Sequence, residues 1–123
     1  MREIEFRGKE KIGEWIYGYL GKSYGSLVID NVAVIPETVG QYIGIRNGKG
    51  VKVFEGDILK CEKNNPENPY DPDIDIGVVR WKDGCFRIDD IGYVDMIDND
   101  FDEIEVIGNI HDNPELLEEL KNE

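Results

Sequence analysis

The chain has 123 residues, 40% of them hydrophobic, which is enough for one ordinary domain with a single buried core. The formal net charge of −13 opposes nucleic-acid binding, because every bound phosphate group must be met by a cation. No apolar run approaches the ~18 residues of a membrane-spanning helix, and the N-terminus lacks an apolar signal region, so we expect a cytoplasmic protein with no membrane contact.

Charge is distributed unevenly along the chain. Residues 1–52 hold eight basic and six acidic side chains, a net charge of +2, whereas residues 53–123 hold six basic and 21 acidic side chains, a net charge of −15. The acidic part favours a basic partner surface, either on a second copy of this chain or on a basic host protein. The alternative is that the excess acid only keeps a small protein soluble.

Alternating apolar and charged residues predict short strands along most of the chain. This period-two pattern covers residues 2–7, 14–20, 78–81, 85–88 and 103–110. In the second of these segments it would place Trp15, Tyr17 and Tyr19 on one side of a strand. Two further β-branched runs in residues 26–35 are separated by an Asp-Asn dipeptide, which suits a turn.

Two glycine-containing dipeptides predict hairpins. Asp83-Gly84 lies between two alternating runs, which is the strongest short-range signal for a type I′ turn. Asn47-Gly48 likewise fits the tip of a hairpin that joins QYIGI to VKVF. The same glycine-rich segment is not a phosphate-binding loop, because it is one residue too short and has glycine where a hydroxyl residue should follow the lysine.

Only the C-terminus is predicted to be helical. The Asn-Pro pair at residues 113–114 suits a helix start, and Leu116, Leu117 and Leu120 then form one narrow apolar stripe. A helix of eight or so residues is marginal in isolation, so this helix must dock on the sheet or on a neighbouring subunit. Residues 62–76, with three prolines and few apolar side chains, predict a long loop between two strands.

No residue is assigned to catalysis, to a cofactor or to a metal. Acidic ladders at residues 71–75 and 98–102 lack the glycine and the glutamate that an EF-hand loop needs at positions six and twelve. His111 is the single histidine and is expected in a turn, while Cys61 and Cys85 lack the paired spacing of a zinc site and are expected to be thiols. A catalytic carboxylate pair stays open among 27 acidic residues, but no pair stands out.

A candidate interaction surface combines aromatic, basic and acidic side chains. Exposed aromatic side chains beside arginine residues can grip a protein partner or stack on bases, although aromatic residues at strand spacing more often fill a core or an interface. The candidate residues are Trp15, Tyr17, Tyr19, Arg46, Lys49, Asp98, Asp100 and Asp102.

Several stretches of the chain, in this order, resemble the YopX family of phage and prophage proteins. They are REIEFRG, GEWIYGYL, IPETVGQYIGI, NGKGVKVFEGDILK, GVVRWKDGCF and EVIGNIHDNPELLEE. The resemblance spares mainly the 62–76 loop and the acidic residues 89–102. Two departures are Ile43, where the family more often has threonine, and a shortened turn after Gly44.

The resemblance implies a mainly β protein without an established activity, so it supplies no catalytic residues. EGDILK and the later GVVRW-KDG-CFRI hairpin are also similar to the strand order of SH3-like barrels, an analogy of pattern that does not settle function. We therefore expect one YopX-like domain over residues 1–123. It would have N-terminal strands over about 1–50, a small SH3-like barrel-type core over about 51–111 and a short helix over about 114–121.

Three functions stay open at this point. The leading expectation is a non-enzymatic phage accessory protein that works by binding, as a homo-oligomer. A second is an acidic nucleic-acid mimic that inhibits a basic host DNA-binding protein, which requires a fixed array of carboxylates. A third, ranked last, is an enzyme with a carboxylate pair. Direct nucleic-acid binding would need one set of basic residues to converge on one face, namely Arg2, Arg7, Lys9, Arg46 and Lys49.

Overall fold

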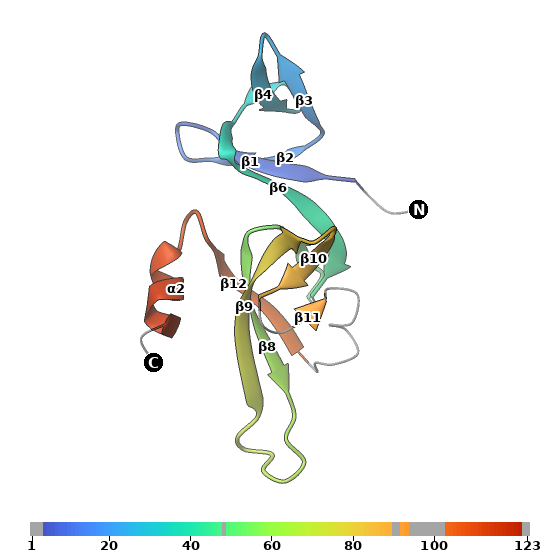
Figure 1. The fold of residues 1–123 in the computed structure, drawn as a ribbon, viewed down its shortest axis with the longest axis vertical. Coiled ribbons are helices and arrows are strands. Elements are labelled where there is room, and N and C mark those ends of the chain that lie inside the picture. Colours follow the sequence, from blue (N-terminus) through green and yellow to red (C-terminus); the bar gives the residue numbers. More distant parts are fainter. Residues whose placement is uncertain (1–3, 48, 90–91, 94–102, 122–123) are drawn as a thin grey trace.

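The structure is a computed structural model, and it describes residues 4–47, 49–89, 92–93 and 103–121 (Figure 1). The described chain is mainly β, as predicted, and forms three antiparallel sheets and one short helix. The four-stranded sheet has the order β2 (Trp15–Gly18), β1 (Phe6–Lys9), β6 (Ile35–Arg46), β7 (Lys52–Phe54). The three-stranded sheet has the order β3 (Leu20–Ser23), β4 (Ser26–Ile29), β5 (Val32–Ala33).

The third sheet and the helix follow along the chain. The five-stranded sheet has the order β11 (Gly92–Tyr93), β10 (Cys85–Ile88), β9 (Asp73–Lys82), β8 (Asp57–Lys63), β12 (Glu103–Asn109). The helix α2 (Pro114–Lys121) begins at the predicted proline. Figure 1 shows the three-stranded sheet at one end of the long axis, the five-stranded sheet at the other, and the long strand β6 running between them.

The five-stranded sheet is open, so the barrel-type closure that we expected is not found among the described residues. Its two edge strands, β11 and β12, are separated by β10, β9 and β8 and do not pair with each other. The apolar face of the sheet is covered instead by the β6–β7 hairpin, because Ile43 and Val53 join Leu59, Val79 and Ile88 in one buried cluster. A covered face needs no closure.

Two-residue turns with positive φ connect three pairs of strands. The predicted turn at Asp83-Gly84 is confirmed, with φ of 55° and 84°, between Lys82 and Cys85, which face each other on β9 and β10. The Asp-Asn turn between β4 and β5 is confirmed as well, with φ of 49° and 68°. The turn at residues 24–25, with φ of 50° and 82°, joins β3 to β4 in the same way. All three suit type I′ hairpins.

Two predicted segments differ from the structure. The expected strand over residues 14–20 is divided at Gly18, because the Tyr19 amide donates a 2.9 Å hydrogen bond to Asp30 and the chain turns into the three-stranded sheet. The expected loop over residues 62–76 is shorter, since β8 and β9 continue their pairing out to Lys63 and Asp73. Backbone pairing therefore overrides the polar composition at the ends of that loop.

The β6–β7 hairpin confirms the predicted connection at residues 46–52. The Asn47 side chain accepts hydrogen bonds from the amides of Lys49 and Val51, at 2.9 and 3.0 Å, and so organises this turn. Both cysteines are free, Cys61 buried in the core and Cys85 half-buried. Within the part of the chain that the structure describes, no helix is long and apolar enough to cross a lipid bilayer.

Candidate interaction surfaces

A polar cluster joins the four-stranded sheet to the five-stranded sheet, and we call it the junction cluster. It consists of Arg7, Lys9 and Trp15 from the first sheet with Asp57, His111 and Asp112 from the start of β8 and the β12–α2 turn. Arg7 faces Tyr17 and Lys9 faces Trp15 across β1 and β2, so all four side chains share one sheet face.

A buried ion pair lies at the centre of the junction cluster. Arg7 Nη2 lies 2.7 Å from Asp57 Oδ1, and the two side chains are 7% and 2% exposed. The second Asp57 oxygen accepts a 2.8 Å hydrogen bond from the Phe54 amide. Burial raises the pKa of Asp57, and the Arg7 charge and the Phe54 amide oppose that rise. The guanidinium also lies over the rings of Trp15 and Phe54, at 4.7 and 5.1 Å from their centroids.

A second, less buried set of contacts holds the β12–α2 turn to the first sheet. Asp112 accepts a 2.5 Å hydrogen bond from Lys9 Nζ and a 2.7 Å hydrogen bond from Trp15 Nε1. These bonds lower the pKa of Asp112 to about 2. His111 lies in the turn, as predicted, and its amide bonds the Asn109 side chain at 3.0 Å. Burial and the nearby Arg7 charge lower the pKa of His111, so the imidazole is neutral at pH 7.

A cavity of about 460 Å³ lies beside the junction cluster, and Arg7, Tyr17, Phe54, Asp57 and Asn109 contribute to its lining. Arg7 is paired with Asp57 through Nη2, while its buried Nε has no hydrogen-bond partner among the described residues. The Asn109 side chain accepts from two backbone amides in the following turn. Polar groups satisfied in this way have little left to offer a ligand, so we assign the cluster an architectural role.

A smaller hollow on the other side of the junction contains two carboxylates. Glu37 and Glu55 contribute to the lining of this space of about 260 Å³, together with Arg80 and the neutral His111. It lies below the ~300 Å³ lower end of typical ligand sites. An enzyme with a catalytic carboxylate pair would have to form that pair from Glu37 and Glu55 here. In the described residues, no group of three or more His, Cys, Asp or Glu side chains could hold a metal ion.

The predicted aromatic residues are divided between two environments. Trp15 is half-buried in the junction cluster, and Tyr17 packs edge-on against Phe54, with ring centroids 5.4 Å apart, while 48% of it stays exposed. Tyr19 lies beyond the division at Gly18 and is 78% exposed. The prediction of a single aromatic face is therefore wrong for Tyr19, because the chain leaves the sheet before reaching it.

The predicted basic residues that the structure describes do not converge on one face, and Arg2 lies outside the described residues. Arg7 and Lys9 are paired with Asp57 and Asp112; Lys9 faces Ile35 at the start of β6, and Arg7 faces Gly40 in its middle. Arg46 ends β6, where its Nη1 bonds the Gly50 carbonyl at 3.3 Å. Eleven residues of extended strand separate Ile35 from Arg46, which is roughly 36 Å, and six separate Gly40 from Arg46, which is roughly 20 Å. Lys49 is exposed in the same turn as Arg46. This separation disfavours direct nucleic-acid binding.

The described acidic residues lie on both faces of the five-stranded sheet. Asp75 is paired with Cys61, and Glu105 is paired with Lys60. Because neighbouring residues of β8 point to opposite faces, these two carboxylates also point to opposite faces. The ladder of Asp98, Asp100 and Asp102 lies outside the described residues.

An apolar groove lies in the N-terminal lobe, by which we mean β1–β5 with the first residues of β6. Its volume is about 1040 Å³, and its apolar lining includes Ile12, Leu27, Val32, Ala33, Ile35 and Pro36. Ile12 projects from the β1–β2 turn and is 77% exposed. Exposed lysines Lys11 and Lys22 border the same groove. The sequence offered one signal for it, an isoleucine in a polar turn, which our sequence analysis did not use.

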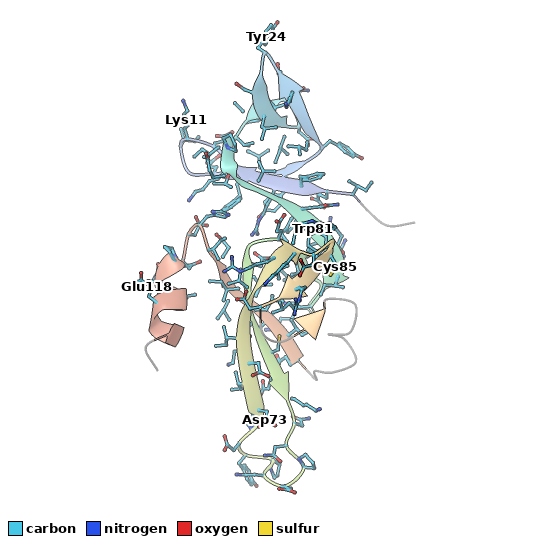
Figure 2. All side chains as sticks on the ribbon, viewed as in Figure 1. Lys11, Tyr24, Asp73, Trp81, Cys85 and Glu118 are labelled. Carbon is cyan, nitrogen blue, oxygen red and sulfur yellow. The ribbon has the colours of Figure 1, made fainter. Side chains whose placement is uncertain are left out.

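The helix α2 stands apart from the sheets. Figure 1 shows it beside the five-stranded sheet, running away from the N-terminal lobe. Among the described residues, no strand makes extensive contact with it; Leu116 is half-buried, and the side chains of Leu117 and Leu120 lie outside the part that the structure describes. Its start is held by Asn113, whose amide bonds the Asn109 carbonyl at 2.8 Å and whose side chain accepts the Asn109 amide at 3.2 Å. Figure 2 shows Lys11 of the groove and Glu118 of α2 on the same side of the molecule.

Comparisons with known proteins agree with this architecture. The crystal structure of protein EF1440 from Enterococcus faecalis is similar to this chain, with a TM-score of 0.60 and 23% sequence identity, over 95% of this chain and 99% of that one. At that identity the likeness shows the fold alone. No curated protein matches the sequence. The profile of the YopX protein family matches residues 3–118, so the chain belongs to the YopX protein family.

Proposed function

We propose that this protein is a phage- or prophage-derived accessory protein of the host cytoplasm that acts by binding rather than by catalysis, and that it self-associates. The observation that carries the proposal is the separation of two unlike ends along one long axis. One end offers an exposed apolar groove bordered by lysines, and the other belongs to the part of the chain with a net charge of −15. Unlike ends attract each other in a head-to-tail arrangement.

Two observations favour this proposal over the other two functions. A nucleic-acid mimic needs its carboxylates on one face, whereas Asp75 and Glu105 point to opposite faces of the sheet. An enzyme with a carboxylate pair would have to use Glu37 and Glu55 in a hollow of about 260 Å³. Replacing both residues by glutamine tests that alternative, because a binding protein should keep its association unchanged.

The solution mass of the protein tests the proposal directly. Light scattering over a range of protein concentrations should give a mass above the 14.1 kDa of one chain at about 0.05 M salt. The mass should fall towards that of one chain at about 0.5 M salt, because screening weakens attraction between exposed charges. A mass of 14.1 kDa at every concentration and both salt levels would overturn self-association.

A further inference from the structure

The apolar groove of the N-terminal lobe has the features of a helix-binding site. Ile12 forms one wall from the β1–β2 turn, while Val32 and Ala33 of β5 form another. Since β5 pairs only with β4 among the described strands, its other edge is left open. An apolar groove with polar borders is the usual receiver for the apolar face of an amphipathic helix.

The helix α2 has the complementary chemistry. Its sequence PELLEELK combines a leucine stripe with acidic residues, including the exposed Glu115 and Glu118. The groove is bordered by Lys11 and Lys22 and also by Glu10, so its charged border is basic on balance. A helix of eight residues is marginal without a surface to pack on, and no described strand makes extensive contact with α2. Groove and helix therefore match in both apolar character and charge.

The groove cannot receive the helix of its own chain. Asn109 and Asn113 are bonded to each other at the helix start, and Asp112 is bonded to Lys9 and Trp15. These contacts fix the direction of α2, which runs away from the N-terminal lobe (Figure 1). The helix that fills the groove must therefore come from another molecule.

We infer that the groove binds helix α2 of a second copy of this chain. The inference rests on the proposed self-association and names its interface. The contact is heterologous, because a groove on one copy meets a helix on the other, so repeated contacts close a ring or extend a chain. Apolar contact at Ile12 contributes to the attraction, and pairing between the lysine borders and the acidic helix makes the association sensitive to salt.

A complementation experiment tests the inference. Ile12→Asp introduces a charge into the apolar groove and leaves the helix unchanged. The double substitution Leu117→Asp/Leu120→Asp introduces charges into the leucine stripe of the helix and leaves the groove unchanged. Each variant alone should self-associate at least about tenfold more weakly than the wild type. Mixed together, they retain one good groove and one good helix per pair, so they should form a 1:1 complex. A purification tag of different mass on one variant makes that complex visible by light scattering.

Ile74→Asp is the matched control, since Ile74 is also an exposed isoleucine, 48% exposed, and lies on β9 outside the groove. It should self-associate like the wild type, and thermal unfolding should show that all variants are folded. Failure of the mixture to form a 1:1 complex, or equal effects of Ile12→Asp and Ile74→Asp, would overturn the inference. Self-association of the wild type in the same experiment would then still support the proposed function, whereas a monomeric wild type would overturn both.

Discussion

Replacing Asp57 by asparagine should destabilise the fold strongly, because it leaves the Arg7 charge buried without a counter-charge. The two side chains are only 7% and 2% exposed, so water cannot replace the lost carboxylate. Breaking a buried ion pair from one side typically costs about 3 to 5 kcal/mol. Packing is preserved, because asparagine has nearly the shape of aspartate. The Phe54 amide, which donates a 2.8 Å hydrogen bond to the wild-type carboxylate, can donate to the asparagine side-chain oxygen instead.

The structure contains a matched control for this change. Asp89 also pairs with an arginine, Arg80, at 2.8 Å and also accepts from a backbone amide, that of Val78, at 2.9 Å. The side chains of Arg80 and Asp89 are 50% and 34% exposed, however, so Asp89→Asn should cost about 1 kcal/mol or less. Urea unfolding followed by circular dichroism measures both values. If Asp57→Asn costs no more than Asp89→Asn, the argument that the junction depends on a buried charge pair is refuted.

Replacing the other member of the ion pair, Arg7, should give a loss of stability that depends on pH in a different way. Burial already raises the pKa of Asp57, and Arg7→Met removes the cation that opposes this rise. A carboxyl group with a raised folded-state pKa favours folding below its unfolded pKa and loses that contribution as the pH rises through the folded value. The stability deficit of Arg7→Met should therefore shrink as the pH falls from 7 towards 4. That of Asp57→Asn should not, because arginine stays charged throughout.

Three further predictions follow from single contacts. Asp112→Asn should lower the free energy of unfolding by about 1 kcal/mol at pH 7, after solvent screening is allowed for. This loss should vanish as the pH falls from about 4 through the folded-state pKa of about 2, because the wild-type carboxyl then becomes protonated. Unfolding curves at several pH values measure it. Burial raises the pKa of the Cys61 thiol to about 11, so this thiol should not react at pH 8. A thiol reagent at pH 8 should therefore modify one cysteine per folded chain and two cysteines per chain unfolded in urea. Modification of two cysteines in the folded chain would contradict the burial of Cys61. Gly40→Ala should cost about 1 to 3 kcal/mol in urea unfolding, since its Cβ would lie 2.6 Å from the Glu55 carbonyl oxygen, whereas Gly21→Ala, with 3.8 Å of room, should cost less than 1 kcal/mol.

Local signals in the sequence were sufficient to predict the hairpins and the helix start. Asp83-Gly84 predicted a turn because positive φ at two successive residues is tolerated by few residue types, and the structure has φ of 55° and 84° there. The helix was predicted from a cap and a proline at residues 113–114, and it begins at Pro114. Each of these features depends on neighbours within a few residues, so the sequence contains the necessary information.

Contacts between distant residues could not be predicted in the same way. Nothing near Arg7 in the sequence indicates a partner 50 residues later, and the alternation of its strand predicted only which side it faces. Likewise, Tyr19 leaves the predicted aromatic face because its amide donates a hydrogen bond to Asp30, in the turn between β4 and β5. The apolar groove combines residues of two turns and of strands β3, β4, β5 and β6, and none of these segments indicates a groove by itself. Predicting it would require the tertiary arrangement first.

The stretches that carry the family resemblance and the residues of the two surfaces are distributed differently along the chain. Five of the six junction-cluster residues fall within those stretches, and Lys9 falls between them, as do most residues that line the groove, in residues 9–12 and 21–34. An ion pair buried between two sheets allows few substitutions, because any change leaves a charge unpaired. A groove at the surface allows many, provided that it stays apolar. The stretches that carry the resemblance therefore include most of the contacts that join the two sheets, together with most of helix α2, whereas most of the groove lies outside them.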